Sequence, residues 1–200
     1  MSAWGPRIRV VLAVALAAGP ALWSADQIYL LRHRVRRLLD VQGRATYASL
    51  AFLALAAVAG VVAAAGTPFI PSAEPARWLL AYGTLAIGGW MGLALIGNSY
   101  KIMPFIVWYH RYLPRAGQGP IPVAADIYHE GAANAVLAIH AAAVAVLAAA
   151  AVLGQLELLR AGGVLMAAGG ACHGATMLHM FLPKTSRRGL ARAGPQGVTS

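Results

Sequence analysis

The sequence predicts an all-α integral membrane bundle of about five transmembrane helices, and three observations support this fold class. Of its 200 residues, 60% are hydrophobic and only 11% are charged, whereas a soluble domain carries about a quarter charged residues. Several apolar runs approach the roughly 20 residues that cross a bilayer as a helix. Nearly all Arg and Lys residues lie between or beyond these runs, as topology determinants do.

Each apolar run is predicted to be a helix, because backbone groups in lipid must form their hydrogen bonds internally. The predicted helices cover about residues 10–31, 48–66, 78–97, 132–153 and 161–182. The first run is interrupted by Gly19-Pro20, and the last is closed by Pro183. We therefore expect a single transmembrane domain over 1–200, with an interfacial segment at 98–131 and a basic tail at 183–200.

The charged segments predict an orientation. Segment 32–45 contains five arginines, and the tail carries four cationic side chains and no acid. Basic loops face the cytoplasm, so we expect 32–45, 98–131 and 183–200 to be cytoplasmic, in the cell membrane, with the N-terminus outside. Arg7 and Arg9 oppose this orientation, and residues 1–25 also fit a cleaved signal peptide. A first transmembrane helix is preferred; a place within a longer polytopic protein would remove the conflict.

The composition and motifs exclude several classes of function. The net charge is +10, but no basic face is interleaved with stacking aromatics, so nucleic acid is not an expected partner. With one cysteine, Cys172, neither an intrachain disulfide nor a CxxC redox pair can form. No nucleophile elbow, P-loop, metalloprotease helix or dinucleotide fingerprint is present, so enzymatic activity is not predicted. The expected partners are the lipid bilayer and a membrane protein or second copy.

Two histidines are the main candidates for cofactor binding. His140 lies nine residues after Gly131, and His173 lies nine residues before Leu182, which places each about 13 Å inside its helix. A short turn joins the two helices, so they are expected to be antiparallel neighbours with the histidines at matched depth. Ionisable residues inside a membrane usually face the bundle interior.

Four further residues are secondary candidates for the same site. His129 precedes His140 by three helical turns, and His179 lies near the end of the last helix. Asn98 and Lys101, with Tyr100, belong to an aromatic-rich stretch that either forms an interfacial belt or caps a buried polar site.

Three interpretations of the paired histidines stay open. In the first interpretation, the two histidines are axial ligands of a heme, with heme b the expected form. Alternatively, Met166, Met177 and Met180 near His173 provide soft ligands for copper as Cu(I). In the third interpretation both histidines form hydrogen bonds across helices without any ligand.

Two glycine pairs predict close helix packing. Gly170-xxx-Gly174 in the fifth run and Gly88-xxx-Gly92 in the third have the small-residue spacing that lets helices approach in membranes.

One stretch resembles a known group of proteins. The residues Lys101-Ile102-Met103-Pro104-Phe105-Ile106-Val107-Trp108, followed by Ile121-Pro122-Val123 and Asp126-Ile127-Tyr128, are similar to uncharacterised bacterial polytopic membrane proteins. These proteins resemble heme-copper oxidase subunit I in their helical layout. That pattern has a histidine just before the Tyr-Lys-Ile segment, where this chain reads Gly97-Asn98-Ser99. The resemblance implies heme binding without a complete oxygen-reducing site.

From the sequence we therefore expect a multi-pass membrane protein that binds heme or serves as a redox accessory of a respiratory system. The alternatives are a cofactor-free membrane subunit that packs against a larger partner through its glycine faces, and a metal or small-molecule permease.

Overall fold

The computed structural model describes residues 6–33, 39–65, 74–118 and 121–183, and this part of the chain is helical without a strand. The all-α class is confirmed. The helices are α1 (Pro6–Arg32), α2 (Val41–Ala65), α3 (Pro75–Gly83), the π-helix η1 (Thr84–Gly92), α4 (Leu93–Arg111), α5 (Glu130–Leu153) and α6 (Leu156–Met180). Two short 3-10 turns, η2 (Leu113–Arg115) and η3 (Ala124–Asp126), lie between α4 and α5. The predicted tail, apart from Pro183, lies outside the described residues.

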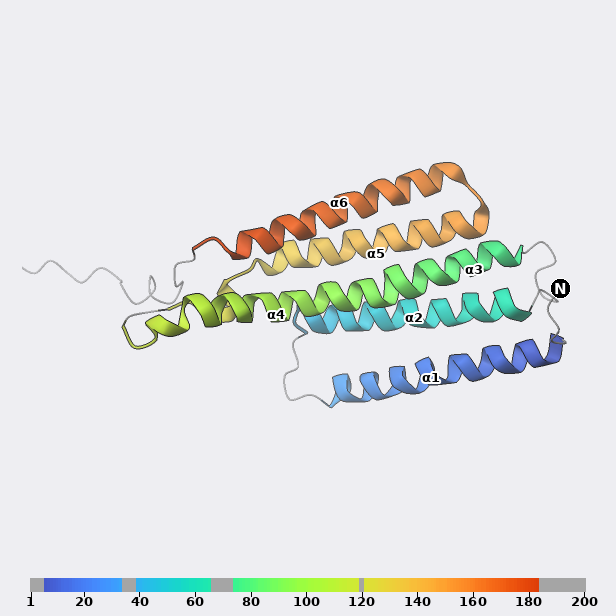
Figure 1. Ribbon diagram of the computed structural model, residues 1–200, viewed down its shortest axis with the longest axis horizontal. Helices are drawn as coiled ribbons and strands as arrows, with labels where there is room; N and C mark the ends of the chain where they lie inside the picture. Colours follow the sequence, from blue (N-terminus) through green and yellow to red (C-terminus); the bar gives the residue numbers. More distant parts are fainter. Residues whose placement is uncertain (1–5, 34–38, 66–73, 119–120, 184–200) are drawn as a thin grey trace, which may run out of the picture.

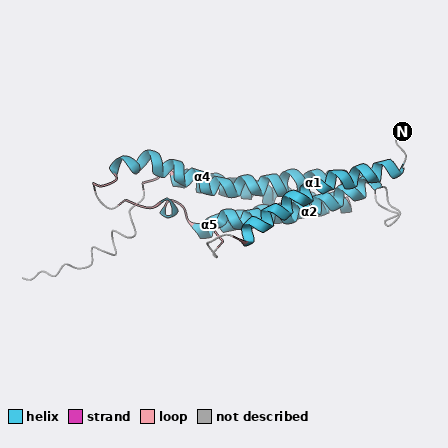
Figure 2. Ribbon diagram, turned by 90° about the horizontal axis from the view of Figure 1, so that it is seen from below, coloured by secondary structure: helices cyan, strands magenta, loops and turns pink. Residues whose placement is uncertain are grey.

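The long helices run alternately up and down in an open row (Figure 1). α1 packs on α2; α2 packs on the continuous helix α3–η1–α4; that helix packs on α5; and α5 packs on α6. α1 and α6 form opposite edges of the row, and the view turned by 90° shows the helices aligned along one long axis (Figure 2). We call the end where α1, α4 and α6 finish and α2 and α5 begin the Glu130 end. The opposite end, at the α5–α6 turn, is the Gly154 end.

Three of these helices are long and apolar enough to cross a membrane. They are Val41–Ala64 with 24 residues, the continuous helix Pro75–Arg111 with 37, and Glu130–Leu153 with 24. At 1.5 Å per residue, 24 residues reach about 36 Å, which exceeds the ~30 Å of a bilayer's hydrocarbon core. Large apolar side chains such as Leu55, Ile87 and Leu95 point outward from them. These features indicate a membrane protein.

The third helix extends further than the predicted 78–97: it runs unbroken through Pro104 and ends at Arg111. Pro104 removes one backbone donor, which costs the Tyr100 carbonyl its usual intrahelical partner. Packing compensates for this loss, since Pro104 and Val107 are buried in the bundle. Residues 98–111 of the predicted interfacial segment are thus helical. The chain that follows these residues returns to α4, where the Trp108 indole N–H donates to the Pro122 carbonyl (2.8 Å) and holds it in place.

Glycines set how closely the inner helices approach. An added Cβ would lie 2.6 Å from Phe52 at Gly89 and 3.2 Å from Val144 at Gly88. The close face predicted for Gly88-xxx-Gly92 is confirmed, and it meets α5. An added Cβ on Gly170 or Gly174 would meet nothing within 4 Å, so the packing predicted for that pair is not made within the described chain.

The side of α6 that meets α5 carries other glycines. Gly162 lies against Leu147 and Gly169 against Ile139, where an added Cβ would come within 2.7 Å and 3.3 Å of those side chains. Both glycines are buried. The side chains of Leu147 and Ile139 fill the space beside these two glycines, and this fit determines which face of α6 packs against α5.

Arginines cap helix ends at both ends of the row. The Arg77 guanidinium lies over Gly154, which has a φ of +67° and ends α5 in the left-handed conformation. At the other end, Arg111 donates to the Phe181 carbonyl just after α6. A cation at a helix C-terminus is favoured by the helix dipole, so these contacts stabilise neighbouring helices at each end.

Candidate functional site

His140 and His173 both lie within the bundle, but they bond to different turns of one helix. The His140 Nε2–H donates to the Gly88 carbonyl oxygen in η1 at 2.9 Å. Because a carbonyl only accepts, this bond places a proton on Nε2. Gly92 makes room for the imidazole, since an added Cβ there would lie 2.8 Å from Nε2. A π-helix is rare and is often found at functional sites.

His173 faces three hydroxyl groups, and we call Ser99, Tyr100, His173 and Thr176 the His173 cluster. The Ser99 hydroxyl donates to the Ile96 carbonyl (2.7 Å), so its lone pairs face His173 Nε2 at 3.5 Å. The Tyr100 hydroxyl lies 2.7 Å from Thr176 Oγ1 and 3.4 Å from His173 Nδ1. Thr176 donates to the His173 carbonyl (2.8 Å), so Tyr100 is the donor toward Thr176.

The two Nε2 atoms do not meet at a common iron in this arrangement. Their partners, Gly88 and Ser99, are eleven residues apart on one continuous helix, or about 16 Å along its axis. Metal–imidazole bonds of about 2 Å would require the two nitrogens to be only about 4 Å apart. The geometry fits interhelical hydrogen bonds. Ligation of one heme by both side chains stays a prediction that requires both rings to leave these bonds.

The secondary candidates do not join the His173 cluster. Asn98 and Lys101 are exposed and share Gln42: Lys101 Nζ donates to its Oε1 at 2.9 Å, and its Nε2 donates to Asn98 Oδ1 at 3.2 Å. His129 is exposed at the N-cap position of α5, and His179 is exposed in the last turn of α6. These four residues therefore lie toward solvent or headgroups.

The three methionines predicted as copper ligands divide between two hydrophobic clusters. Met166 packs with Val144 and Ala148 toward the Gly154 end, whereas Met177 and Met180 pack in the cluster of the Glu130 end. Met166 and Met180 are separated by about 21 Å along α6, so they cannot hold one ion together. Within the residues that the structure describes, no group of three or more His, Cys, Asp or Glu side chains is placed to hold a metal.

Tyr128 was not predicted as a site residue from the sequence, and it lies between the His173 cluster and the Glu130 end. Its ring lies 5.7 Å from that of Tyr100, measured between centroids. Burial, and then the charges of Glu130 and Asp40, raise the pKa of the Tyr128 phenol, while Arg44 lowers it. Nothing in the local pattern marks Tyr128, because its role arises from helices that meet in space.

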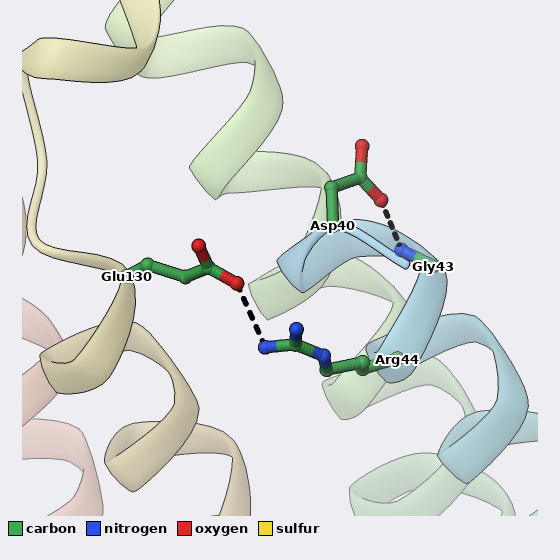
Figure 3. A network of polar contacts seen from close by, with 4 residues as sticks. All are labelled: Asp40, Gly43, Arg44 and Glu130. Atoms are coloured by element: carbon green, nitrogen blue, oxygen red, sulfur yellow. Dashed lines mark hydrogen bonds and ion pairs between the residues drawn. The ribbon is translucent and has the colours of Figure 1, made fainter. Parts of the chain in front are cut away.

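The charged residues beside Tyr128 organise this end of the row (Figure 3). Arg44 of α2 pairs with Glu130 at the start of α5, with 2.9 Å between Nη1 and Oε1. Asp40 precedes α2, and its carboxylate accepts the Gly43 N–H at 2.8 Å, which satisfies one of the free donors of the first turn. Both carboxylates are exposed to solvent.

Comparisons of the chain with protein-family models, curated proteins and solved structures find no match. By its fold and its site, the described part of the chain is an all-helical protein with three helices able to cross a membrane and an interior histidine–tyrosine cluster.

Proposed function

We propose that this chain is a five-span subunit of the cell membrane that packs laterally against a membrane-protein partner through α6. In this arrangement α1 and α6 also cross the bilayer, and the Glu130 end faces the cytoplasm. Support comes from the alternating direction of the helices, which brings the ends of α1, α4 and α6 and the starts of α2 and α5 to one end (Figure 1). These are the helix ends that adjoin the predicted basic segments. Positive charge in the connecting loops favours the cytoplasmic side.

The observation that carries the proposal is the one-sided packing of α6. Its neighbours are α5 and, to a lesser extent, α4. Gly162 and Gly169 use their small size against α5, but Gly163, Gly170 and Gly174 have nothing within 4 Å. Each glycine costs about 1 kcal/mol relative to alanine within a helix. In membranes that loss is commonly offset by close helix approach.

The three glycines of the open face stand among other small residues in the middle of α6, while Leu156 and Leu178 are exposed toward its two ends. Ala167 and Ala171 are exposed between the three glycines, and Ala175 is exposed directly after Gly174. By contrast, α2 and η1 present Leu55, Val58 and Ile87 outward. Lipid tails gain no advantage from a smooth surface, but a second helix can approach it closely. We therefore assign this face to a transmembrane helix of a partner.

The test compares two glycine-to-leucine variants by the size of the assembly extracted from native membranes. Gly170→Leu places a bulky side chain on the open face and is expected to reduce the assembly to the single chain. Gly83→Leu is the matched control, because Gly83 also has nothing within 4 Å but lies in α3. Assemblies of equal size in both variants and the wild type would refute the proposal.

Heme binding is the second candidate function, and one observation favours it. His140 lies in α5 and His173 in α6, and these two helices pack against each other. The visible spectrum of the purified protein separates the two candidates. A Soret band that sharpens on reduction, vanishes in His140→Ala or His173→Ala and persists in the exposed-residue control His110→Ala supports heme. A colourless, well-folded protein favours the packing subunit.

The third alternative from the sequence, a metal or small-molecule permease, stays a prediction.

A further inference from the structure

We propose that His140 is a latch that holds the third helix in a register with one residue more than α-helical turns would contain. The latch is the hydrogen bond from His140 Nε2 to the Gly88 carbonyl oxygen of η1, at 2.9 Å. Breaking this bond lets η1 return to α-helical geometry and turns α4 about its axis. The proposal goes beyond lateral packing through α6 and depends on neither candidate function.

The end of η1 leaves a carbonyl that needs a donor from another helix. In a π-helix each carbonyl accepts from the N–H five residues later, so the Gly88 carbonyl would accept from Leu93, the first residue of α4. The Leu93 N–H donates instead to the carbonyls of Gly89 and Trp90. The Gly88 carbonyl is therefore passed over where the helix narrows. His140 supplies the donor that a backbone carbonyl inside a bundle requires.

The extra residue aligns two close contacts with α2. An added Cβ on Gly89 would lie 2.6 Å from Phe52, and one on Gly97 would overlap the Ala45 Cβ. Phe52 and Ala45 are seven residues apart, about two turns, and so lie on one side of α2.

α-Helical geometry alone would not bring these two glycines to the same side. Gly89 and Gly97 are eight residues apart, and at about 100° per residue an α-helix would offset them by about 80°. Seven α-helical residues would offset them by only about 20°. The wide turns of η1 absorb one residue, which explains why both glycines face α2.

The same register places the His173 cluster. Ser99 and Tyr100 follow η1 on α4, and both face the His173 imidazole of α6. Because α4 is helical throughout, a turn at η1 carries both hydroxyls with it. Return of η1 to α-helical geometry turns α4 by about 100°, the angle of one residue, and takes them away from His173. His140 of α5 is thereby coupled to a cluster formed by α4 and α6.

The first half of the third helix is held in place independently. The Arg77 guanidinium lies over Gly154 at the end of α5, and the Tyr82 ring lies against Gly60 of α2. These contacts anchor α3, so α4 is the half that turns when the latch opens.

Cysteine cross-linking in the full chain measures the register. Two pairs are introduced separately into a Cys172→Ser background and treated with a short bifunctional thiol reagent. The α4 pair is Gln42→Cys with Asn98→Cys, whose native side chains are bonded at 3.2 Å. The α3 pair is Gly60→Cys with Tyr82→Cys, since an added Cβ on Gly60 would lie 3.1 Å from the Tyr82 ring.

Two substitutions of His140 separate the hydrogen bond from the bulk of the ring. His140→Phe keeps a ring but cannot donate. It is expected to lower the cross-linking rate of the α4 pair by about tenfold, the effect of leaving one buried acceptor unpaired, and to leave the α3 pair unchanged. His140→Gln retains an N–H donor and is the matched control, expected to cross-link like the wild type. Equal rates in these two variants, high or low, overturn the latch.

Deletion of Met91 tests the extra residue without altering His140. Met91 lies in η1 and is 48% exposed. Without it, Gly89 and Gly97 are seven residues apart, so η1 becomes α-helical and α4 keeps its orientation. Both pairs are expected to cross-link as before, and the deletion should also restore the α4 pair in His140→Phe. Loss of the α4 cross-link on this deletion overturns the proposal even if His140→Phe does not fold.

Deletion of Leu55 is the matched control, because Leu55 is 54% exposed in the middle of α2, which is α-helical throughout. The two halves of α2 must then turn relative to each other by about 100°, so one of the two cross-links is expected to be lost. Survival of both would show that tolerance of a deletion is not particular to η1 and would also overturn the proposal. The Gly170→Leu assembly test and the visible spectrum report on the candidate functions alone, so the latch fails or stands separately from them.

Discussion

The contact between Gly97 of α4 and Ala45 of α2 makes a quantitative prediction about how the inner helices pack. A Cβ added to Gly97 would overlap the Ala45 Cβ and lie 3.6 Å from Cα and the carbonyl oxygen of Gln42. Ala45 is 1% exposed. Neither Cβ can rotate away from its backbone, so Gly97→Ala must push α2 and α4 apart.

The magnitude follows from two opposing effects. Overpacking of a buried contact costs about 1–3 kcal/mol, while replacing glycine by alanine within a helix returns about 1 kcal/mol. We expect Gly97→Ala to lower the free energy of unfolding by about 0–2 kcal/mol. Gly170→Ala, which meets nothing within 4 Å, should instead leave it unchanged or raise it by up to about 1 kcal/mol.

A compensating exchange makes the test specific. Ala45→Gly removes the obstructing Cβ, so the double variant Gly97→Ala/Ala45→Gly should be more stable than the sum of the single effects by about 2 kcal/mol, within the range for contacting residues. The assay is unfolding by SDS in mixed micelles, followed by circular dichroism. Single effects that add to within about 0.5 kcal/mol would show that the two positions do not touch, and the packing described here would be wrong.

Three further substitutions are predicted together. Arg44→Ala should lower stability by no more than about 1 kcal/mol in the same SDS assay, because the side chains of its ion pair with Glu130 are 44% and 58% exposed; a larger loss would reveal a buried role. Gly154→Ala should cost about 1–2 kcal/mol, since φ there is +67°, and an unchanged denaturation midpoint would contradict that conformation. The raised pKa of Tyr128 means that its contribution is complete below the unfolded-state pKa of 10.0 and is lost as pH rises through the higher folded-state value. Tyr128→Phe should therefore reduce the alkaline loss of stability, and identical alkaline profiles would exclude this effect.

The sequence predicted the helices well where hydropathy is high and poorly where helices leave the lipid. The predicted run 132–153 became α5, which begins at Glu130. By contrast, α2 begins at Val41 rather than near residue 48. Its first turns contain Gln42 and Arg44, and a hydropathy pattern does not detect a helix where such polar residues extend it beyond the hydrocarbon core. The same reason explains the unpredicted continuation of α4.

The site was predicted in part for a related reason. Helix spacing gave the depth of His140 and His173, but not the direction of each ring. That direction depends on which side of α5 and α6 faces the third helix. Gly88 and Gly92 admit His140, while Ser99 and Tyr100 receive His173. Spacing along one helix carries no information about such partners.

The glycines of α6 show the same limit. Gly162 and Gly169 are as regularly spaced as Gly170 and Gly174, and only the shape of α5 selects between the two faces. Leu147 and Ile139 fill the space beside the first pair. Because these side chains come from another helix, the choice of face could not be predicted from the glycine pattern alone.

Sidedness is the most direct test of the proposed membrane arrangement. Single cysteines are introduced into a Cys172→Ser background at Asp40 and Gln118, near the Glu130 end, and at Glu74 and Gln155, near the Gly154 end. Intact cells are then treated with a membrane-impermeant maleimide. The arrangement predicts labelling at Glu74 and Gln155 and protection at Asp40 and Gln118 until the membrane is opened. Labelling of Asp40 but not Gln118 would place the two connections on opposite sides and contradict it.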